Sequence, residues 1–358
     1  MRAIVLVGGE GTRLRPLTLS TPKQMLPIVD VPMIERVLGN LIPHGIDEAV
    51  LSLGYLPEAF VDAYPQSTIA GIKVSYAVEP EALDTAGAIR FAAEFAGIDD
   101  TFLVVNGDVL TDLDISALVG FHREHEAEGT IALHPVEDPS SFGVVPTDDR
   151  GRVIEFVEKP SRDAAPTNQI NAGTYVLEPS FLDRVPSGRR VSIERETFPL
   201  MAGDRQLYAC SDDSYWLDTG TPANFIQAHR DIIEGRREGI PAPGAIELRA
   251  AVWVVGMPRI EGQVRSPCYL GEGAVIHEGG AVERSVLGPG CVVESGARVV
   301  GSVMLAGSRV AHNSSVSGSI LGNGAIVGER CDVRPVSILG HGAVVAAGST
   351  VDGERVPA

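Results

Sequence analysis

Residues 1–235 alternate between short apolar runs and stretches whose apolar positions recur with helical spacing. Four runs have the length of buried parallel strands: Ala3–Val7, Ala49–Leu53, Ile72–Ala77 and Phe102–Val105. Helical spacing is found at Pro32–His44, Pro57–Ala63, Thr85–Phe95 and Thr221–Glu234. This order predicts an α/β fold with a doubly wound, mostly parallel sheet, right-handed crossovers and ligands at the carboxyl ends of the strands. Between Thr130 and Val176 shorter β-rich pieces predict a substrate-side insertion.

The C-terminal part has a different periodicity. It follows the Gly- and Pro-rich segment Gly235–Gly244, which predicts a linker. Aliphatic or small residues then recur every six positions: Leu270, Ile276, Val282; Leu287, Val293, Val299, Leu305, Ala311, Ser317; and Leu321, Val327, Val333, Leu339, Val345, Val351. A period of six is typical of a parallel β-helix, in which every sixth side chain points into the same column. We therefore predict two domains, residues 1–240 and residues 241–358.

The composition is that of a globular protein. The chain has 358 residues, of which 44% are hydrophobic and 21% charged, which excludes a disordered chain. No apolar run approaches the ~18 residues that span a bilayer. The first apolar run leads directly into Gly8 and Gly9 without the features of a signal peptide, so we expect a cytoplasmic protein that does not bind a membrane. The four cysteines have no zinc-ligand spacing and are expected to be reduced and mostly buried.

A loop rich in glycine and cations follows the first apolar run. The net charge of −18 repels nucleic acid, so no nucleic-acid partner is expected. Against this background Arg13, Arg15 and Lys23 predict a polyphosphate site, and the neighbouring glycine N–H groups can cradle a phosphate. The loop is not a dinucleotide fingerprint, because Leu14 stands where the third glycine would be, and it lacks the Lys-Ser/Thr of a Walker loop. Glycine-rich turns also occur as purely structural features.

The sequence of this loop resembles a known signature. Residues 8–18 read GGEGTRLRPLT and are followed by Pro22-Lys23, which is similar to the signature of sugar-1-phosphate nucleotidylyltransferases. Further motifs of that family follow in its order: Asn106–Asp108, Phe142–Val145, Phe156–Pro160, Asn171–Gly173 and Trp216–Gly220. Within the family, Leu6–Gly9, Ser192–Pro199 and the hexapeptide repeats most resemble mannose-1-phosphate guanylyltransferases. The resemblance covers residues 1–230 and the repeats, and it implies a left-handed β-helix.

The resemblance implies that a nucleoside triphosphate and a sugar 1-phosphate react to give a nucleotide-sugar and pyrophosphate. Because one anion attacks another, such a site must neutralise charge and position the reactants. The implied catalytic residues are Arg13 on the departing β- and γ-phosphates, Lys23 near the α-phosphate, and Asp108 and Asp218 as ligands of Mg²⁺. Mg²⁺ prefers hard carboxylate oxygens and open water positions.

The resemblance also implies a set of substrate-binding residues. They are Leu6, Gly8, Gly9, Gly11, Thr12, Glu79, Gly87, Gly143, Glu158, Lys159 and Asn171. The first three would line the base and ribose, and Glu79 and Gly87 would read the base edge. Gly143, Glu158 and Asn171 would hold the sugar hydroxyls and Lys159 the phosphate of the sugar. A site that hydrogen-bonds hydroxyl groups discriminates strongly against analogues that lack them.

One loop departs from the family pattern. Residues 82–87 read ALDTAG where the family usually has Pro-Leu-Gly-Thr-Ala/Gly-Gly, so Asp84 replaces a glycine and Ala82 a proline. This leaves the nucleobase open. GTP with mannose 1-phosphate is the leading pair, and the alternatives are dTTP, UTP or ATP with glucose 1-phosphate, or GTP with a cyclitol phosphate. A regulatory paralogue without activity is disfavoured, because the full catalytic set is present.

Other polar residues and the repeats have simpler interpretations. Glu194 and Glu196 suit a solvated pair in the first turn of a helix. His277, His312 and His341 lie in different coils without a recognisable partner, so we expect surface residues rather than the catalytic base of an acyltransferase. The repeats present flat faces and coil edges, which predict a homo-oligomer assembled through the β-helix.

Overall fold

The computed structural model describes residues 1–237 and 239–358, which divide into two compact units. Unit 1 comprises Met1–Gly9 and Ile34–Trp216, and unit 2 comprises Glu10–Met33 and Leu217–Ala358. The domain boundary at residue 240 stays a prediction. Within the described ranges, no helix is long and apolar enough to cross a membrane. All four cysteines are described and are thiols, three of them buried, as expected from the sequence.

Unit 1 is built on a ten-stranded sheet in the order β11-β10-β12-β7-β1-β4-β6-β5, with β9 beside β12 and β13 beside β9. Its central strands are parallel, as predicted: β1 (Ala3–Leu6), β4 (Glu48–Leu53), β6 (Ile72–Val78) and β7 (Phe102–Asn106). Antiparallel pairs extend this core, and the strands that contribute are β5 (Thr68–Ile69), β9 (Gly129–Pro135), β10 (Gly143–Val144), β11 (Val157–Glu158) and β12 (Gln169–Leu177). Strand β13 (Leu207–Ser211) is parallel to β9.

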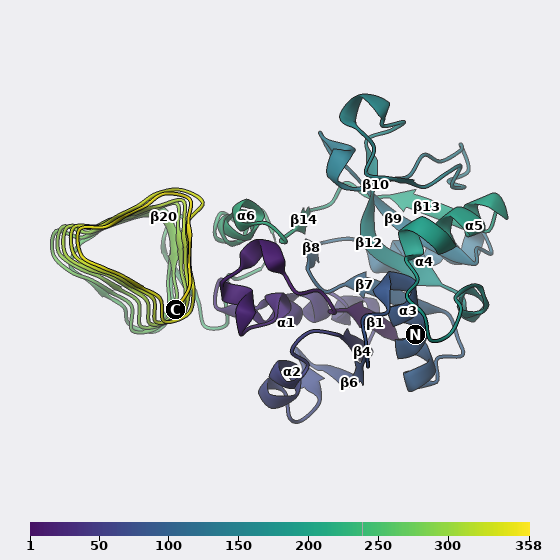
Figure 1. Ribbon diagram of the computed structural model, residues 1–358, viewed down its shortest axis with the longest axis horizontal. Helices are drawn as coiled ribbons and strands as arrows, with labels where there is room; N and C mark the ends of the chain where they lie inside the picture. The colour runs from purple at the N-terminus through teal and green to yellow at the C-terminus, as the bar shows by residue number, and fades with distance from the viewer. Residues whose placement is uncertain (238) are drawn as a thin grey trace. The chain divides into compact units, whose positions relative to one another are not determined.

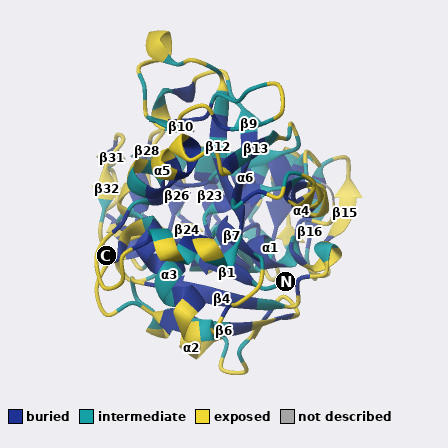
Figure 2. Ribbon diagram, turned by 90° about the vertical axis from the view of Figure 1, so that its right-hand side faces the viewer, coloured by how far each residue is buried: buried dark blue, intermediate teal, exposed yellow. Residues whose placement is uncertain are grey.

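Helices cover this sheet and supply the rest of its core. They are α1 (Met33–Gly39), α2 (Glu58–Ala63), α3 (Asp84–Ala96), α4 (Ile115–Glu124) and α5 (Phe198–Gly203). Figure 2 shows strands β1, β4 and β7 in the colour of buried residues, whereas α2 and α3 expose one side. The core contains the fully buried Phe102, Tyr175 and Phe198. Helix α4 was not predicted; it begins at Asp114, whose carboxylate accepts a hydrogen bond from the N–H of Ala117.

Unit 2 contains a left-handed parallel β-helix, which Figure 1 shows as stacked triangular coils in green to yellow. After the hairpin of β15 (Ile246–Arg249) and β16 (Val252–Val254), the strands of successive coils pair in parallel. They are β17 (Arg259–Ile260), β18 (Gln263–Leu270), β19 (Val275–Ile276), β20 (Ala281–Leu287), β21 (Val292–Val293), β22 (Arg298–Val300), β23 (Val303–Met304), β24 (Arg309–Val310), β25 (Ser315–Ser317), β26 (Ile320–Leu321), β27 (Ile326–Val327), β28 (Asp332–Val333), β29 (Ile338–Leu339), β30 (Val344–Val345), β31 (Thr350–Val351) and β32 (Arg355–Val356).

The core columns of the β-helix differ from the prediction in one coil. Leu287, Val293 and Val299 belong to the core, but the next positions are Met304, Val310 and Val316. The prediction of Leu305, Ala311 and Ser317 at these core positions is wrong by one residue. The physical reason is the register: Leu287 pairs with Met304, so the corner after Val299 is one residue shorter than the six-residue repeat.

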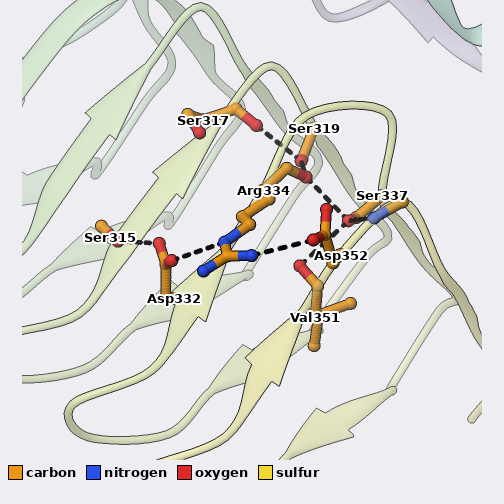
Figure 3. Close-up of polar contacts among 9 residues, drawn as sticks. Ser315, Ser317, Ser319, Asp332, Arg334, Ser337, Val351 and Asp352 are labelled. Carbon is orange, nitrogen blue, oxygen red and sulfur yellow. Dashed lines mark hydrogen bonds and ion pairs between the residues drawn. The ribbon is translucent and has the colours of Figure 1, made fainter.

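Buried serines follow one corner of the β-helix from coil to coil. Ser285, Ser302, Ser319 and Ser337 are all at most 1% exposed. The Ser285 hydroxyl accepts from the N–H of Ser302, and the Ser302 hydroxyl accepts from the N–H of Ser319. Figure 3 shows the C-terminal end of this corner, where the Ser319 hydroxyl contacts the Arg334 carbonyl. The serines thus satisfy backbone groups at the corners, outside the strand ladders.

Unit 2 also contains helix α6 (Pro222–Ile233) and the segment Glu10–Met33, which we call the signature segment. Helix α6 begins at Thr221, whose hydroxyl accepts from the N–H of Asn224. It packs against β18 and β20 of the β-helix. The signature segment has short 3-10 turns at Thr12–Leu14, Leu17–Leu19 and Lys23–Met25, and a small hairpin of β2 (Pro27–Ile28) and β3 (Val31–Pro32).

Candidate active site

The signature segment turns on Gly11. This residue has φ 60 and caps the turn Thr12–Leu14, a conformation that glycine adopts without the strain of a side chain. Its carbonyl accepts from the N–H of Leu14 and from the hydroxyl of Thr18, both at 2.9 Å. A Cβ here would lie 3.0 Å from Thr18 Cγ2 and 3.1 Å from Lys23 Cβ. Gly11 therefore lets the two ends of the cationic loop approach each other.

Arg13 and Asp218 lie together in unit 2. Arg13 Nη2 is 4.0 Å from Asp218 Oδ2, and the two side chains are 59% and 25% exposed. Asp218 ends β14 (Trp216–Asp218), and its Oδ1 accepts from the N–H of Gly220 at 2.7 Å. The backbone carbonyl of Asp218 accepts from Asn224 Nδ2, also at 2.7 Å. The first hydrogen bond orients the carboxylate of Asp218 and the second holds its backbone, while the other carboxylate oxygen faces the guanidinium of Arg13.

Lys23 differs from Arg13 in its surroundings. It lies in the turn Lys23–Met25 and is only 5% exposed. Its stem packs beside Gly11. Lys23 is therefore almost fully enclosed, whereas the guanidinium of Arg13 reaches into solvent. Thr12, beside Arg13, is exposed at the start of its turn.

In unit 1, Asp108 follows the carboxyl end of a central strand, as predicted. It lies in the turn between β7 and β8 (Val109–Thr111) and is half-buried. The turn is tied to β1, because the N–H of Gly107 donates to the Leu6 carbonyl at 2.9 Å. A Cβ on Gly107 would lie 3.0 Å from that carbonyl oxygen. The glycine thus allows Asp108 to follow the edge where β1 and β7 end.

Glu79 anchors the loop that follows β6. Its Oε1 accepts from the Ser52 hydroxyl at 3.0 Å, and its Oε2 accepts from the N–H of Leu83 at 3.1 Å. A Cβ on Gly8 would lie 3.5 Å from Glu79 Oε1, whereas nothing lies within 4 Å of the corresponding position at Gly9. The structure therefore brings Gly8 and Glu79 together at the ends of β1 and β6.

The loop of residues 82–87, which differs from the family pattern, has an unusual backbone conformation at Asp84. Asp84 has φ 61, in the left-handed region, and its Oδ1 accepts from the N–H of Thr85. This explains why a glycine is usual there. Gly87 lies in the first turns of α3 and is buried, and its N–H donates to the Val191 carbonyl at 3.2 Å. A Cβ on Gly87 would lie 3.0 Å from the Arg189 carbonyl, so this glycine has a packing role.

The residues expected to hold the sugar lie on β10, β11 and β12. Asn171 Nδ2 donates to the Tyr175 hydroxyl and its Oδ1 accepts from the N–H of Gly173, each at 2.9 Å. Gly143 is buried beside Glu158, whose Oε2 would lie 3.2 Å from a Cβ on the glycine. Lys159 Nζ lies 3.3 Å from Glu158 Oε1. The structure thus groups Asn171 with Tyr175, and Gly143 with Glu158 and Lys159.

Tyr175 joins these groups electrostatically. Burial raises the pKa of its phenol above the ordinary value, and the negative charges of Glu194, Glu158 and Asp108 raise it further. The same phenol accepts from Asn171. Three carboxylates therefore act on one buried hydroxyl group. Sequence reasoning missed Tyr175, since a tyrosine within an apolar strand carries no signal of its own.

Glu194 and Glu196 lie in the first turn of a π-helical segment, Ile193–Thr197. The turn position was predicted, but the side chains are hydrogen-bonded. Glu194 Oε2 accepts from the hydroxyls of Thr85 and Ser192, both at 2.8 Å. The N–H of Ile193 donates to the Thr85 hydroxyl at 2.8 Å. The segment therefore fixes the start of α3, and π-helical turns frequently occur near functional sites.

The histidines of the β-helix have neighbours that the sequence did not reveal. His277 Nδ1 lies 3.2 Å from Arg259 Nη2 and 3.7 Å from Glu261 Oε2. His341 contacts the signature segment. His312 is exposed, as expected.

Comparisons with known proteins agree with this arrangement. The family model described as nucleotidyl transferase matches residues 2–235, and the model described as GMPPB C-terminal domain matches residues 264–358. The chain is 41% identical over 295 residues to mannose-1-phosphate guanylyltransferase of Mycobacterium tuberculosis, covering 78% of this chain and 81% of that protein. It is 34% identical over 319 residues to UTP–glucose-1-phosphate uridylyltransferase of Synechocystis sp., covering 80% and 82%.

A solved structure is also similar. HddC from Yersinia pseudotuberculosis, also solved in complex with GMP-PN, has a TM-score of 0.56 at 27% identity and covers 64% of this chain and 98% of its own. The motifs, the fold and the relatives agree. The chain belongs to the nucleotidyl transferase family and is a sugar-1-phosphate nucleotidylyltransferase most similar to the mannose-1-phosphate guanylyltransferases.

Proposed function

We propose that the protein transfers GMP from GTP to mannose 1-phosphate, giving GDP-mannose and pyrophosphate. The observation that carries this proposal is the pairing of Arg13 with Asp218. Arg13 lies on the signature segment, which also contains the buried Lys23. The relative from Mycobacterium tuberculosis supports the substrate pair, as does the related HddC structure in complex with GMP-PN.

Arg13 and Lys23 suit different steps of this transfer. The guanidinium of Arg13 is mostly exposed, so the β- and γ-phosphates can bind to its planar N–H fork. Lys23 is almost fully buried, so its ammonium group is held in place and would stabilise the charge that develops on the α-phosphate. Positioned charges of this kind lower the barrier for an anionic nucleophile without a covalent intermediate.

Enzymes of this family use a divalent metal, and we propose that here it is Mg²⁺. Among the described residues no group of three or more His, Cys, Asp and Glu side chains could hold a metal ion. A site with only two carboxylates still suits Mg²⁺, because this ion is commonly bound by one or two carboxylates and by water and substrate phosphates. Asp108 and Asp218 would supply the carboxylates, and Asp218 would use Oδ2, since Oδ1 accepts from Gly220. The ion would neutralise charge on the phosphates when bound.

The sugar end of the substrate would lie at Asn171, Glu158 and Lys159. The hydrogen bonds of Asn171 to Gly173 and Tyr175 fix the orientation of its amide, so its second N–H can be directed at a sugar hydroxyl. Glu158 offers a carboxylate that is 24% exposed, and Lys159 is 58% exposed beside it. These residues provide an acceptor for hydroxyls and a cation for the 1-phosphate.

A second candidate reaction is uridylyl transfer from UTP to glucose 1-phosphate. The similarity to the Synechocystis relative favours it. Pyrophosphate release should be measured for GTP, UTP, dTTP and ATP against mannose 1-phosphate and glucose 1-phosphate. The proposal expects the highest kcat/KM for GTP with mannose 1-phosphate. A tenfold advantage for UTP with glucose 1-phosphate would overturn the substrate pair, and no turnover with any pair would favour the regulatory paralogue.

We also propose that the protein self-associates through its β-helix. On the sheet that contains β27 and β30, Ile326 and Val344 are paired in register and are 39% and 64% exposed. Two neighbouring apolar side chains on one face suit contact with the same face of a second copy. Light scattering should give a mass above the monomer for the wild type and a lower mass for Val344→Asp. Val336→Asp, at another exposed valine, is the control. A monomeric wild type would contradict this proposal.

A further inference from the structure

The signature segment has little regular structure of its own. Its 3-10 turns and two-residue strands contain few internal backbone bonds, and such pieces are rarely stable alone. Yet it carries Arg13 and Lys23, whose positions decide how a triphosphate binds. Something outside the segment must therefore fix its conformation. In unit 2 such contacts come from helix α6, where His229 Nδ1 accepts from the N–H of Val29 at 3.1 Å, and from the β-helix.

His341 is the clearest of these contacts. Its Nδ1 accepts from the N–H of Asn323 in the preceding coil at 2.9 Å. Burial lowers the pKa of His341 below its ordinary value, so the ring is neutral near pH 7 and its single proton lies on Nε2. That nitrogen lies 3.4 Å from the Thr21 hydroxyl, and the ring hydrogen-bonds to the backbone of Leu17. The coil thus selects the tautomer that donates to the signature segment.

Three glycines of the β-helix make room for the segment. Gly271, Gly288 and Gly340 follow the core positions Leu270, Leu287 and Leu339, which pair in register with the neighbouring coils. A Cβ on Gly271 would lie 2.7 Å from Asp30 Oδ2, and a Cβ on Gly340 would lie 3.1 Å from Pro16 Cγ. Two positions of the signature segment, Pro16 and Asp30, therefore approach the backbone of the β-helix closely.

The neighbouring face of the β-helix is covered as well. Val303, Ile320 and Ile338 are at most 1% exposed but do not belong to the core cluster inside the coils. Apolar side chains that point away from a core and are still buried must pack against another part of the protein. This burial is independent of the hydrogen bonds of His341. It shows that this face of the coils is packed against other residues of the protein.

We propose that His341 is a positioning residue that holds the triphosphate-binding segment in its active conformation. The contact lies between the two cations in sequence, because Leu17 and Thr21 both stand between Arg13 and Lys23. Fixing this stretch fixes the spacing of the two positive charges that meet one triphosphate. The proposal rests on the proposed function, in which Arg13 and Lys23 bind the phosphates.

Two substitutions test the hydrogen bonds of the two ring nitrogens of His341 separately. In His341→Asn the amide oxygen can replace Nδ1 and accept from Asn323, but the side chain is too short to reach the signature segment. In His341→Gln the amide nitrogen can replace Nε2 and donate to Leu17 or Thr21. Loss of one hydrogen bond predicts a KM for the triphosphate about fivefold to tenfold higher in His341→Asn, with the KM for the sugar phosphate within about twofold of wild type. His341→Gln should restore the triphosphate KM, and the exposed His312→Asn should change neither constant.

A second readout does not need turnover. Hydrogen exchange should be faster at residues 12–26 in His341→Asn than in the wild type, and near normal in His341→Gln. An inactive wild type with this exchange pattern would overturn the proposed function and leave the positioning contact standing. Unchanged exchange and an unchanged triphosphate KM in a folded His341→Asn protein would overturn the role of His341. Equal rises in both Michaelis constants would also overturn it.

Discussion

Replacing Asp218 by Asn should separate catalysis from stability. The substitution keeps an oxygen that can accept from the N–H of Gly220, so the local turn is preserved. It removes the negative charge that faces Arg13 and that would face the metal ion. The shape of the site is therefore unchanged, whereas its electrostatics change by one unit of charge.

The geometry limits the cost in stability. The ion pair of Asp218 with Arg13 spans 4.0 Å, and the two side chains are 25% and 59% exposed. A pair so open to solvent contributes about 0–1 kcal/mol to the free energy of unfolding. Loss of one preorganised electrostatic group in a reaction of this class costs kcat about 10²-fold or more, which is about 2.7 kcal/mol of transition-state stabilisation. The effect on kcat should therefore be much larger than the effect on stability.

The assay is the initial rate of pyrophosphate release at saturating substrates, together with urea unfolding of the same preparations. Asp212→Asn is the matched control, because Asp212 Oδ1 accepts from the N–H of Ser214 at 2.7 Å in the same local pattern. The control should retain wild-type kcat. Asp108→Asn should resemble Asp218→Asn, and the double variant should lose far less than the product of the two effects if both serve one ion. A kcat within threefold of wild type for Asp218→Asn would show that the charge of Asp218 does not act in the transfer.

Three further results are expected. Asp84→Gly should be about 1 kcal/mol more stable to urea than Asp84→Ala, since φ 61 strains alanine but not glycine; equal stability would contradict this. Lys159→Ala should raise the KM for the sugar phosphate and leave the KM for the triphosphate unchanged. The reverse pattern would show that Lys159 binds the triphosphate instead. Burial lowers the pKa of His122 in the folded protein below the ordinary value of 6.5. As the pH falls below 6.5, the imidazole therefore binds a proton in the unfolded chain before it does so in the folded protein. The free energy of unfolding should therefore fall from pH 7 to pH 5, and His122→Gln should weaken that slope; an unchanged slope would show that other groups control it.

The parts that local sequence determines were predictable. Apolar runs bounded by turns indicated β1, β4, β6 and β7, because strands buried on both faces need continuous apolar stretches. The six-residue period indicated the β-helix. Its register failed at Met304, because an apolar residue stands at both Met304 and Leu305, and only the pairing with Leu287 decides which one points inward.

The catalytic candidates were recognisable because the chemistry needs particular residue types in a fixed order. Their support was not recognisable. Tyr175, Thr85 and His341 act through partners distant in sequence, and no spacing rule connects His341 with Thr21. Asp84 was noted as a departure, but its positive φ became evident only in the folded backbone.

The most direct test of the central claim follows oxygen atoms through the reaction. Mannose 1-phosphate with ¹⁸O in its non-bridging phosphate oxygens should be incubated with GTP and Mg²⁺, and the products should be examined by ³¹P NMR and mass spectrometry. Direct attack by the sugar phosphate predicts GDP-mannose with all the label retained, one labelled oxygen bridging the two phosphorus atoms, and unlabelled pyrophosphate. Label in pyrophosphate, or release of GDP or GMP without GDP-mannose, would contradict attack of the sugar phosphate on the α-phosphorus of GTP.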